Sequence, residues 1–155
     1  MNLEKQEHIL RNFGKAKKYY FQALETIRFK VKCVSRNGSV AVVTNIAIIF
    51  QSLGIIHWGL DDFEESKRYF ELSIEAYLTA NGLNHLGLVD SYYNLGLIHF
   101  ELEELPKAED SFRRALEIHS KQFGPSHKMI AMVTRKLAGV LEEAGQSNEA
   151  AQERV

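Results

Sequence analysis

Residues 91–116 read SYYNLGLIHFELEELPKAEDSFRRAL and predict two amphipathic helices joined by a short turn. Tyr92 and Leu95 in the first half, and Phe112 and Ala115 in the second, recur at the spacing of three that places residues on one helix face. One such hairpin cannot bury both of its apolar faces. Further hairpins are therefore expected on either side of it in the chain.

The same pattern returns 42 residues earlier and, in part, 42 residues later. Identical residues related by this step are Leu53 and Leu95, Gly54 and Gly96, Ile56 and Ile98, His57 and His99, Leu60 and Leu102, Phe70 and Phe112, Glu75 and Glu117, Gly82 and Gly124, His85 and His127. A fixed period of this length is typical of stacked helical repeats. We predict a single domain, 1–155, made of a partial repeat 1–34, repeats 43–84 and 85–126, and a partial repeat 127–155.

Gly54 and Gly96 lie in the middle of predicted helices, where glycine costs about 1 kcal/mol relative to alanine. A close approach of the partner helix would offset this penalty. We expect Phe70 and Phe112 to fill the space that the two missing side chains leave.

Small, large aromatic and small residues follow one another at spacings of four and three in the second helix of each hairpin, for example Ala108, Phe112 and Ala115. With Leu-Gly twelve residues upstream, this pattern resembles the tetratricopeptide repeat. The 42-residue period and the boundary residues 82–85 and 124–127 resemble the variant found in kinesin light chains. The resemblance implies an all-α superhelix, a solenoid of stacked antiparallel hairpins, which serves as a non-catalytic scaffold for protein–protein interaction.

In that family the first helices line a concave groove that holds a peptide or a partner's helix. Carried over by position, the groove residues are Gln51, Ser52, Ile55, Tyr93, Asn94, Leu97, Arg135 and Lys136. Asn94 offers a donor and an acceptor to a peptide backbone, and Tyr93 is a candidate aromatic anchor, although both also occur as ordinary surface residues. The basic pair suits an amphipathic peptide with an acidic end. A clamp for chaperone tails is not predicted, because only Asn94 matches its pattern.

Two other functions stay open at this stage. The first is a regulatory receptor whose superhelix changes shape when a peptide binds. The second is an enzyme that uses His57 or His99, although no catalytic motif or metal-ligand spacing accompanies either residue. We expect no enzyme activity, no cofactor and no metal, because repetition accounts for four of the six histidines.

Charge and composition narrow the range of partners. Nineteen basic and twenty acidic residues give a net charge of -1, which does not favour nucleic acid or an anionic membrane. The apolar stretch from 40 to 58 holds several polar residues and is expected to be a buried helix. A polar N-terminus without a secretory signal and the single Cys33 favour a cytoplasmic protein.

The ends of the chain do not complete the pattern. We expect a short second helix from Ser147 to Val155, with Arg154 where Phe70 and Phe112 stand in the other repeats. Such a helix would leave Val133, Leu137 and Val140 poorly covered, and the other end repeats the fault, since Tyr20, Ala23 and Ile27 face only a short partner, 3–10. Uncovered apolar faces predict either that the chain is part of something longer or that it forms a homo-oligomer through the incomplete terminal repeats.

Overall fold

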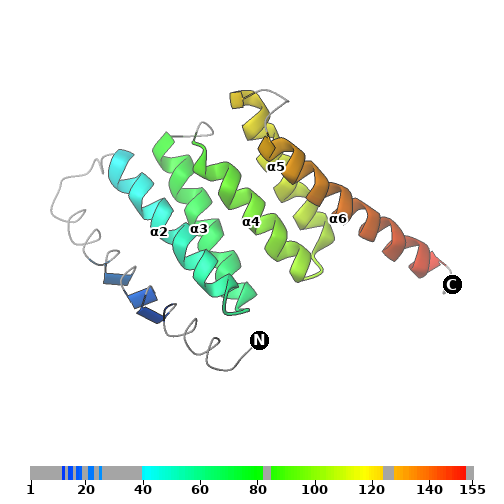
Figure 1. Cartoon of the computed structure of the whole chain (residues 1–155), viewed down its shortest axis with the longest axis horizontal. Helices are drawn as coiled ribbons and strands as arrows, with labels where there is room; N and C mark the ends of the chain where they lie inside the picture. The colour runs from blue at the N-terminus through cyan, green and yellow to red at the C-terminus, as the bar shows by residue number, and fades with distance from the viewer. Residues whose placement is uncertain are drawn as a thin grey trace. The chain divides into compact units, whose positions relative to one another are not determined.

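The computed structural model describes residues 12, 14, 15, 17, 18, 21, 22 and 25, together with 40–81, 85–123 and 128–152. Within these residues all regular structure is helical, which confirms the predicted all-α class. The labelled helices are α2 (Val40–Trp58), α3 (Phe63–Asn81), α4 (Gly87–Glu101), α5 (Leu105–Phe123) and α6 (Lys128–Gln152), shown in Figure 1. Outside the described residues lie several sequence-based assignments, namely those for 3–10, Tyr20, Ala23, Ile27, Cys33, 82–84, 124–127 and Arg154.

The contacts between residues divide the chain into two compact units, Met1–Asn81 and Gly82–Val155. Unit 1 contains the hairpin of α2 and α3, and unit 2 contains α4, α5 and α6. In unit 2, α5 packs against both α4 and α6. The proposed repeat boundaries remain a prediction from the sequence.

Two serine hydroxyls show how closely the helices of unit 1 approach each other. Ser66 Oγ donates a hydrogen bond to the backbone oxygen of Gly54 at 2.7 Å, and Ser73 Oγ donates to that of Ala47 at 2.9 Å. Advancing seven residues along α3 therefore moves the contact seven residues back along α2, so the helices run antiparallel. Both serines are fully buried, and only a small side chain fits at either place.

The two mid-helix glycines make room for the two phenylalanines, as predicted. A Cβ built on Gly54 would lie 2.7 Å from the ring of Phe70, and one built on Gly96 would lie 2.8 Å from the ring of Phe112. Both rings are almost completely buried. Close helix packing therefore compensates for the weak helix propensity of glycine in both units.

The turns between the paired helices have the same construction in both units. Asp61 and Glu103, which lie 42 residues apart, have backbone φ angles of 58° and 59°. Next to them, His57 Nδ1 lies 2.8 Å from Asp62 Oδ2, and His99 Nδ1 is hydrogen-bonded to Glu104 Oε2. Each imidazole thus links the last turn of one helix to the start of the next.

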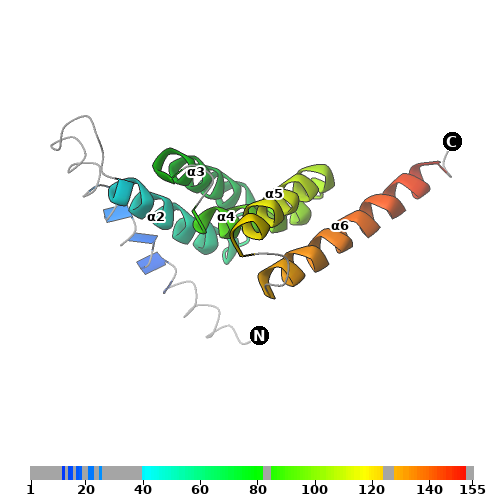
Figure 2. The same ribbon diagram turned by 90° about the horizontal axis from the view of Figure 1, so that it is seen from above.

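The structure corrects the predicted end of the chain. No turn separates a short second helix from the preceding one, because α6 continues without a break from Lys128 to Gln152. Val133 and Val140 are also buried, contrary to expectation, and Leu137 is half-buried. Over residues 128–145, where exposure is described, the exposed apolar positions of α6 are Ala131, Met132, Ala138, Gly139, Leu141 and Gly145. Figures 1 and 2 show the C-terminal half of α6 extending beyond α5.

Among the described residues, α2 alone is long and apolar enough to cross a membrane by length and composition. A core helix of a soluble protein meets the same test, and α2 is tied to α3 by the two serine hydrogen bonds and by the ring of Phe70. Only one face of α2 is buried, however. Ile48 and Ile55 remain 46% and 55% exposed, so the expectation of a buried helix holds for that face alone.

Candidate functional site

A pocket of about 270 Å³ lies between α4 and α6 in unit 2. Its walls come from all three helices of the unit, and its lining residues are Leu97, Phe100, Phe112, Arg135, Lys136, Gly139 and Val140. Three of these, Leu97, Arg135 and Lys136, are groove residues predicted from the sequence. The structure therefore brings these three together at one site.

Gly139 explains why the pocket is open. The positions that correspond to it one and two repeats earlier hold Leu97 and Ile55. A Cβ built on Gly139 would meet no atom within 4 Å, whereas one on Gly96 meets a ring. The missing side chain leaves free volume next to the apolar floor formed by Phe112 and Val140.

Two cations border this apolar floor. Arg135 and Lys136 are both exposed, and within the described part of the chain neither forms an ion pair with a carboxylate. Elsewhere on the surface, basic side chains such as Arg114 and Lys121 are paired with an acid one turn away on their own helix. The two unpaired cations leave positive charge available at the mouth of the pocket.

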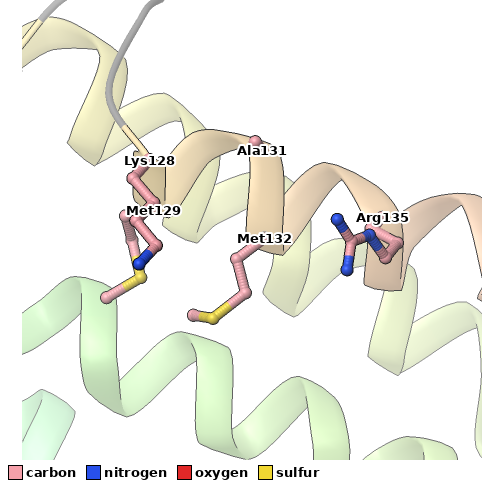
Figure 3. A pocket seen from close by; sticks show the side chains of 5 residues that line it. All are labelled: Lys128, Met129, Ala131, Met132 and Arg135. Carbon is pink, nitrogen blue, oxygen red and sulfur yellow. The ribbon is translucent and has the colours of Figure 1, made fainter.

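A second, more open pocket of about 550 Å³ continues along α6 and shares Arg135 with the first. Its other lining residues are Lys128, Met129, Ala131 and Met132. Figure 3 shows the Met129 and Met132 side chains projecting from the same side of α6. Methionine side chains adapt to ligands of different shape, so this second pocket extends the apolar surface available to a ligand.

Asn94 and Tyr93 on α4 are both half-buried. The Tyr93 ring centroid lies 5.8 Å from that of Phe112, so this ring packs partly against the core of the hairpin. The Asn94 side chain makes no hydrogen bond to any described residue and keeps its donor and acceptor available. Asn94 therefore fits the predicted role better than Tyr93 does.

The remaining predicted groove residues lie on α2 in unit 1. Gln51 Oε1 accepts a hydrogen bond from the Tyr77 hydroxyl at 2.9 Å, and Ser52 Oγ donates to the backbone oxygen of Ile48 at 3.0 Å. Ile55 is 55% exposed. The structure thus gives Gln51 a role within its own hairpin, and it leaves Ile55 as the accessible member of the three.

Sequence reasoning missed Phe100, a lining residue whose only signal was its position one turn beyond Leu97 on the same helix. It also assigned no role to the charge of Asp90, one of the two exposed acidic residues of α4. Partial burial raises the pKa of the Asp90 carboxyl above its ordinary value of 3.8, and the nearby His119 opposes the shift. This carboxyl gives the N-terminal end of α4 a negative group.

The histidines considered for catalysis occupy structural positions. His57 and His99 are 4% and 6% exposed, and each is hydrogen-bonded to the carboxylate five residues later. Since a carboxylate only accepts hydrogen bonds, Nδ1 carries the proton in both rings. Neither residue lines either of the two pockets along α6. No group of three or more His, Cys, Asp or Glu side chains within the described residues could hold a metal ion.

Comparison with known proteins agrees with this geometry. The family described as tetratricopeptide repeat matches residues 45–120 and 88–152. The solved structure of BtubC (BKLC) from P. vanneervenii superimposes with a TM-score of 0.72 at 21% sequence identity, over 92% of this chain and 55% of that one. The chain thus spans about half the length of that structure, and the likeness shows the fold. A comparison with curated protein sequences finds no match.

Proposed function

Because the chain belongs to the tetratricopeptide repeat family, whose repeats generally mediate protein–protein interactions, we propose that it binds a peptide or a partner's helix at the pocket between α4 and α6. The ligand inserts a large apolar side chain beside Gly139 and places acidic residues near Arg135 and Lys136. The observation that carries this proposal is an open apolar pocket bordered by two cations that pair with no carboxylate of the described residues.

The chemistry of the pocket supports a binding site rather than a catalytic one. Apolar volume supplies most of the affinity in such sites, while a few charged groups fix the orientation of the ligand. Asn94, one turn before Leu97, offers hydrogen bonds to the ligand backbone. The family is typically a non-enzymatic scaffold, and no step of a reaction is assigned to any residue.

A selection from a displayed library of random peptides tests the proposal and does not require the natural partner. We expect the selected peptides to carry a leucine or an aromatic residue next to aspartate or glutamate. Gly139→Leu, which restores the leucine of the preceding repeat, fills the pocket and should weaken their binding at least about tenfold. It should not destabilise the fold, because the added side chain enters open space.

Gly145→Leu is the matched control. Gly145 also lies on α6 with no atom near its missing Cβ, but it is not part of either pocket. Equal binding by Gly139→Leu and Gly145→Leu proteins would exclude the pocket as the binding site. Selection of peptides without acidic residues would instead remove the assigned role of Arg135 and Lys136.

The regulatory receptor, in which a bound peptide changes the shape of the superhelix, remains the alternative proposal. Small-angle scattering with and without a selected peptide distinguishes the two. A change of the radius of gyration on binding supports the receptor, and an unchanged one supports a rigid scaffold.

A further inference from the structure

We propose that an uncovered face of α6 pairs with the same face of a second copy of this chain, in an antiparallel dimer. We call this face the α6 seam, and its residues are Ala131, Thr134, Ala138, Leu141 and Gly145. The proposal does not depend on the peptide pocket between α4 and α6, which contains none of the seam residues, although Ala131 of the seam and the adjacent Arg135 both line the second pocket.

The preceding helix shows that positions of this kind are normally covered. Stepping back 42 residues from the first four seam positions leads to Val89, Tyr92, Gly96 and His99 on α4, all of which are buried. Ala131, Thr134 and Ala138 are exposed, and Leu141 is 43% exposed. Positions that correspond by the 42-residue step are therefore buried on α4 and exposed on α6.

Contacts in both units identify what covers these positions. In unit 2, Phe112 of α5 packs on Gly96, and the Arg114 guanidinium lies 5.8 Å from the Tyr92 ring centroid. In unit 1, the ring of Tyr69 on α3 lies 5.2 Å from that of His57, which corresponds to Leu141. The seam is thus the surface that receives a second helix in each earlier hairpin. None of the described helices covers it on α6.

The spacing of the seam residues suits a helix of a second copy. Positions 131, 134, 138, 141 and 145 are separated by three, four, three and four residues, as the a and d positions of a coiled coil are. Antiparallel pairing places Ala138 opposite the partner's Leu141, and Thr134 opposite the partner's Gly145. A large residue then faces a small one, so the two helices can interdigitate without a void.

When two copies of α6 pair antiparallel, the charged residues beside the seam of one copy face residues of opposite charge on the other. Lys128, Arg135, Glu142 and Glu149 follow one another every seven residues along one edge of α6. Antiparallel pairing brings Arg135 beside the partner's Glu142, and it places Lys128 opposite the partner's Glu149 in the sequence register. Lys128, Arg135 and Glu142 form no ion pair with any described residue, so all three are available. A parallel pair would bring no opposite charges together along this edge.

The contact is small, because a single helix from each copy takes part and most of its seam side chains are short. Interfaces below about 1,200 Å² are usually weak or transient. We therefore expect a reversible dimer whose population rises with protein concentration. Added salt should weaken it, because the exposed charge pairs are screened.

Sedimentation velocity of the full chain over a wide range of concentration measures this association directly. Ala138→Glu brings two carboxylates together near the twofold axis and should abolish the dimer. Arg135→Glu and Glu142→Arg each convert two attractive pairs into repulsive ones, and each should weaken dimerisation about tenfold. The double variant, Arg135→Glu with Glu142→Arg, restores opposite charges and should recover the dimer.

Glu71→Arg is the control for a change of charge, because Glu71 is an exposed carboxylate on α3 and is not part of the seam. Circular dichroism melting of each variant establishes that it folds, which is expected for substitutions at exposed positions. A wild-type protein that stays monomeric at every concentration overturns the proposal. A double variant as defective as the two single ones overturns the antiparallel register, and with it the assigned partner surface.

Discussion

Gly96→Ala tests whether close helix packing explains the glycines in the middle of the helices. The added methyl group would lie 2.8 Å from one Phe112 ring atom and 2.9 Å from two others, well inside ordinary contact distance. Phe112 is 1% exposed and packs beside the Tyr93 ring at 5.8 Å between centroids, so its ring can yield only by displacing packed neighbours or by moving into the pocket that it lines. Overpacking of this kind costs about 1–3 kcal/mol, while the better helix propensity of alanine returns about 1 kcal/mol. We expect a net loss of about 1 kcal/mol.

Urea denaturation of Gly96→Ala and Gly145→Ala proteins measures the difference. The control position has no atom within 4 Å of the new methyl group, so alanine should stabilise it by up to about 1 kcal/mol. A second control combines Gly96→Ala with Phe112→Leu, and the pair should cost less than the sum of the single changes, because the ring that clashes is gone. If Gly96→Ala stabilises the protein as much as Gly145→Ala does, the packing explanation is wrong.

Three further predictions concern the turn that follows α4 and the N-terminal end of that helix. Glu103→Gly should raise the free energy of unfolding by about 1 kcal/mol, because glycine adopts the positive φ of 59° without strain; a decrease in a urea titration would contradict this. Glu104→Ala removes the acceptor of His99 and Lys107 and should lower the free energy of unfolding by about 1–2 kcal/mol, whereas Glu101→Ala, the exposed control, should change it little. Asp90→Asn should stabilise the fold near neutrality. The folded state holds the Asp90 proton more tightly than the unfolded state, so stability falls as pH rises from 3.8 through the raised pKa, and the advantage of asparagine should vanish in acid. An equal advantage at both pH values would show that the charge of Asp90 is not the cause.

The hairpins could be predicted from the sequence because their determinants are local and occur twice. The distance along the sequence is the same between Gly54 and Phe70 as between Gly96 and Phe112. The structure places each ring over its glycine. The family assignment followed from the same residues. Of the groove residues predicted from the sequence, Leu97, Arg135 and Lys136 line one pocket, and their role in binding stays a prediction. Phe100 was missed because position alone does not show which side chain reaches a neighbouring helix.

The histidine–carboxylate hydrogen bonds were also missed, although the signal was present in the sequence. Asp62 and Glu104 each follow a histidine by five residues, at the same place in consecutive repeats. Metal-ligand spacings within one helix do not include such a pair. Its two groups are separated by five residues across a turn, and the turn rather than the helix brings them together.

The histidine–carboxylate pair is absent from the third repeat, and this absence explains why α6 does not turn. One repeat after His99 and Glu104 stand Leu141 and Gln146, which cannot form a hydrogen bond between an imidazole and a carboxylate. Gly145 occupies the position of Glu103, where a positive φ is required, and glycine would allow that turn at no cost. The backbone could therefore turn at Gly145, but no histidine–carboxylate hydrogen bond would stabilise the turn. A continued helix keeps one backbone hydrogen bond per residue. The uninterrupted α6 and its open seam thus accompany the absence of the histidine–carboxylate hydrogen bond that is present at both earlier turns.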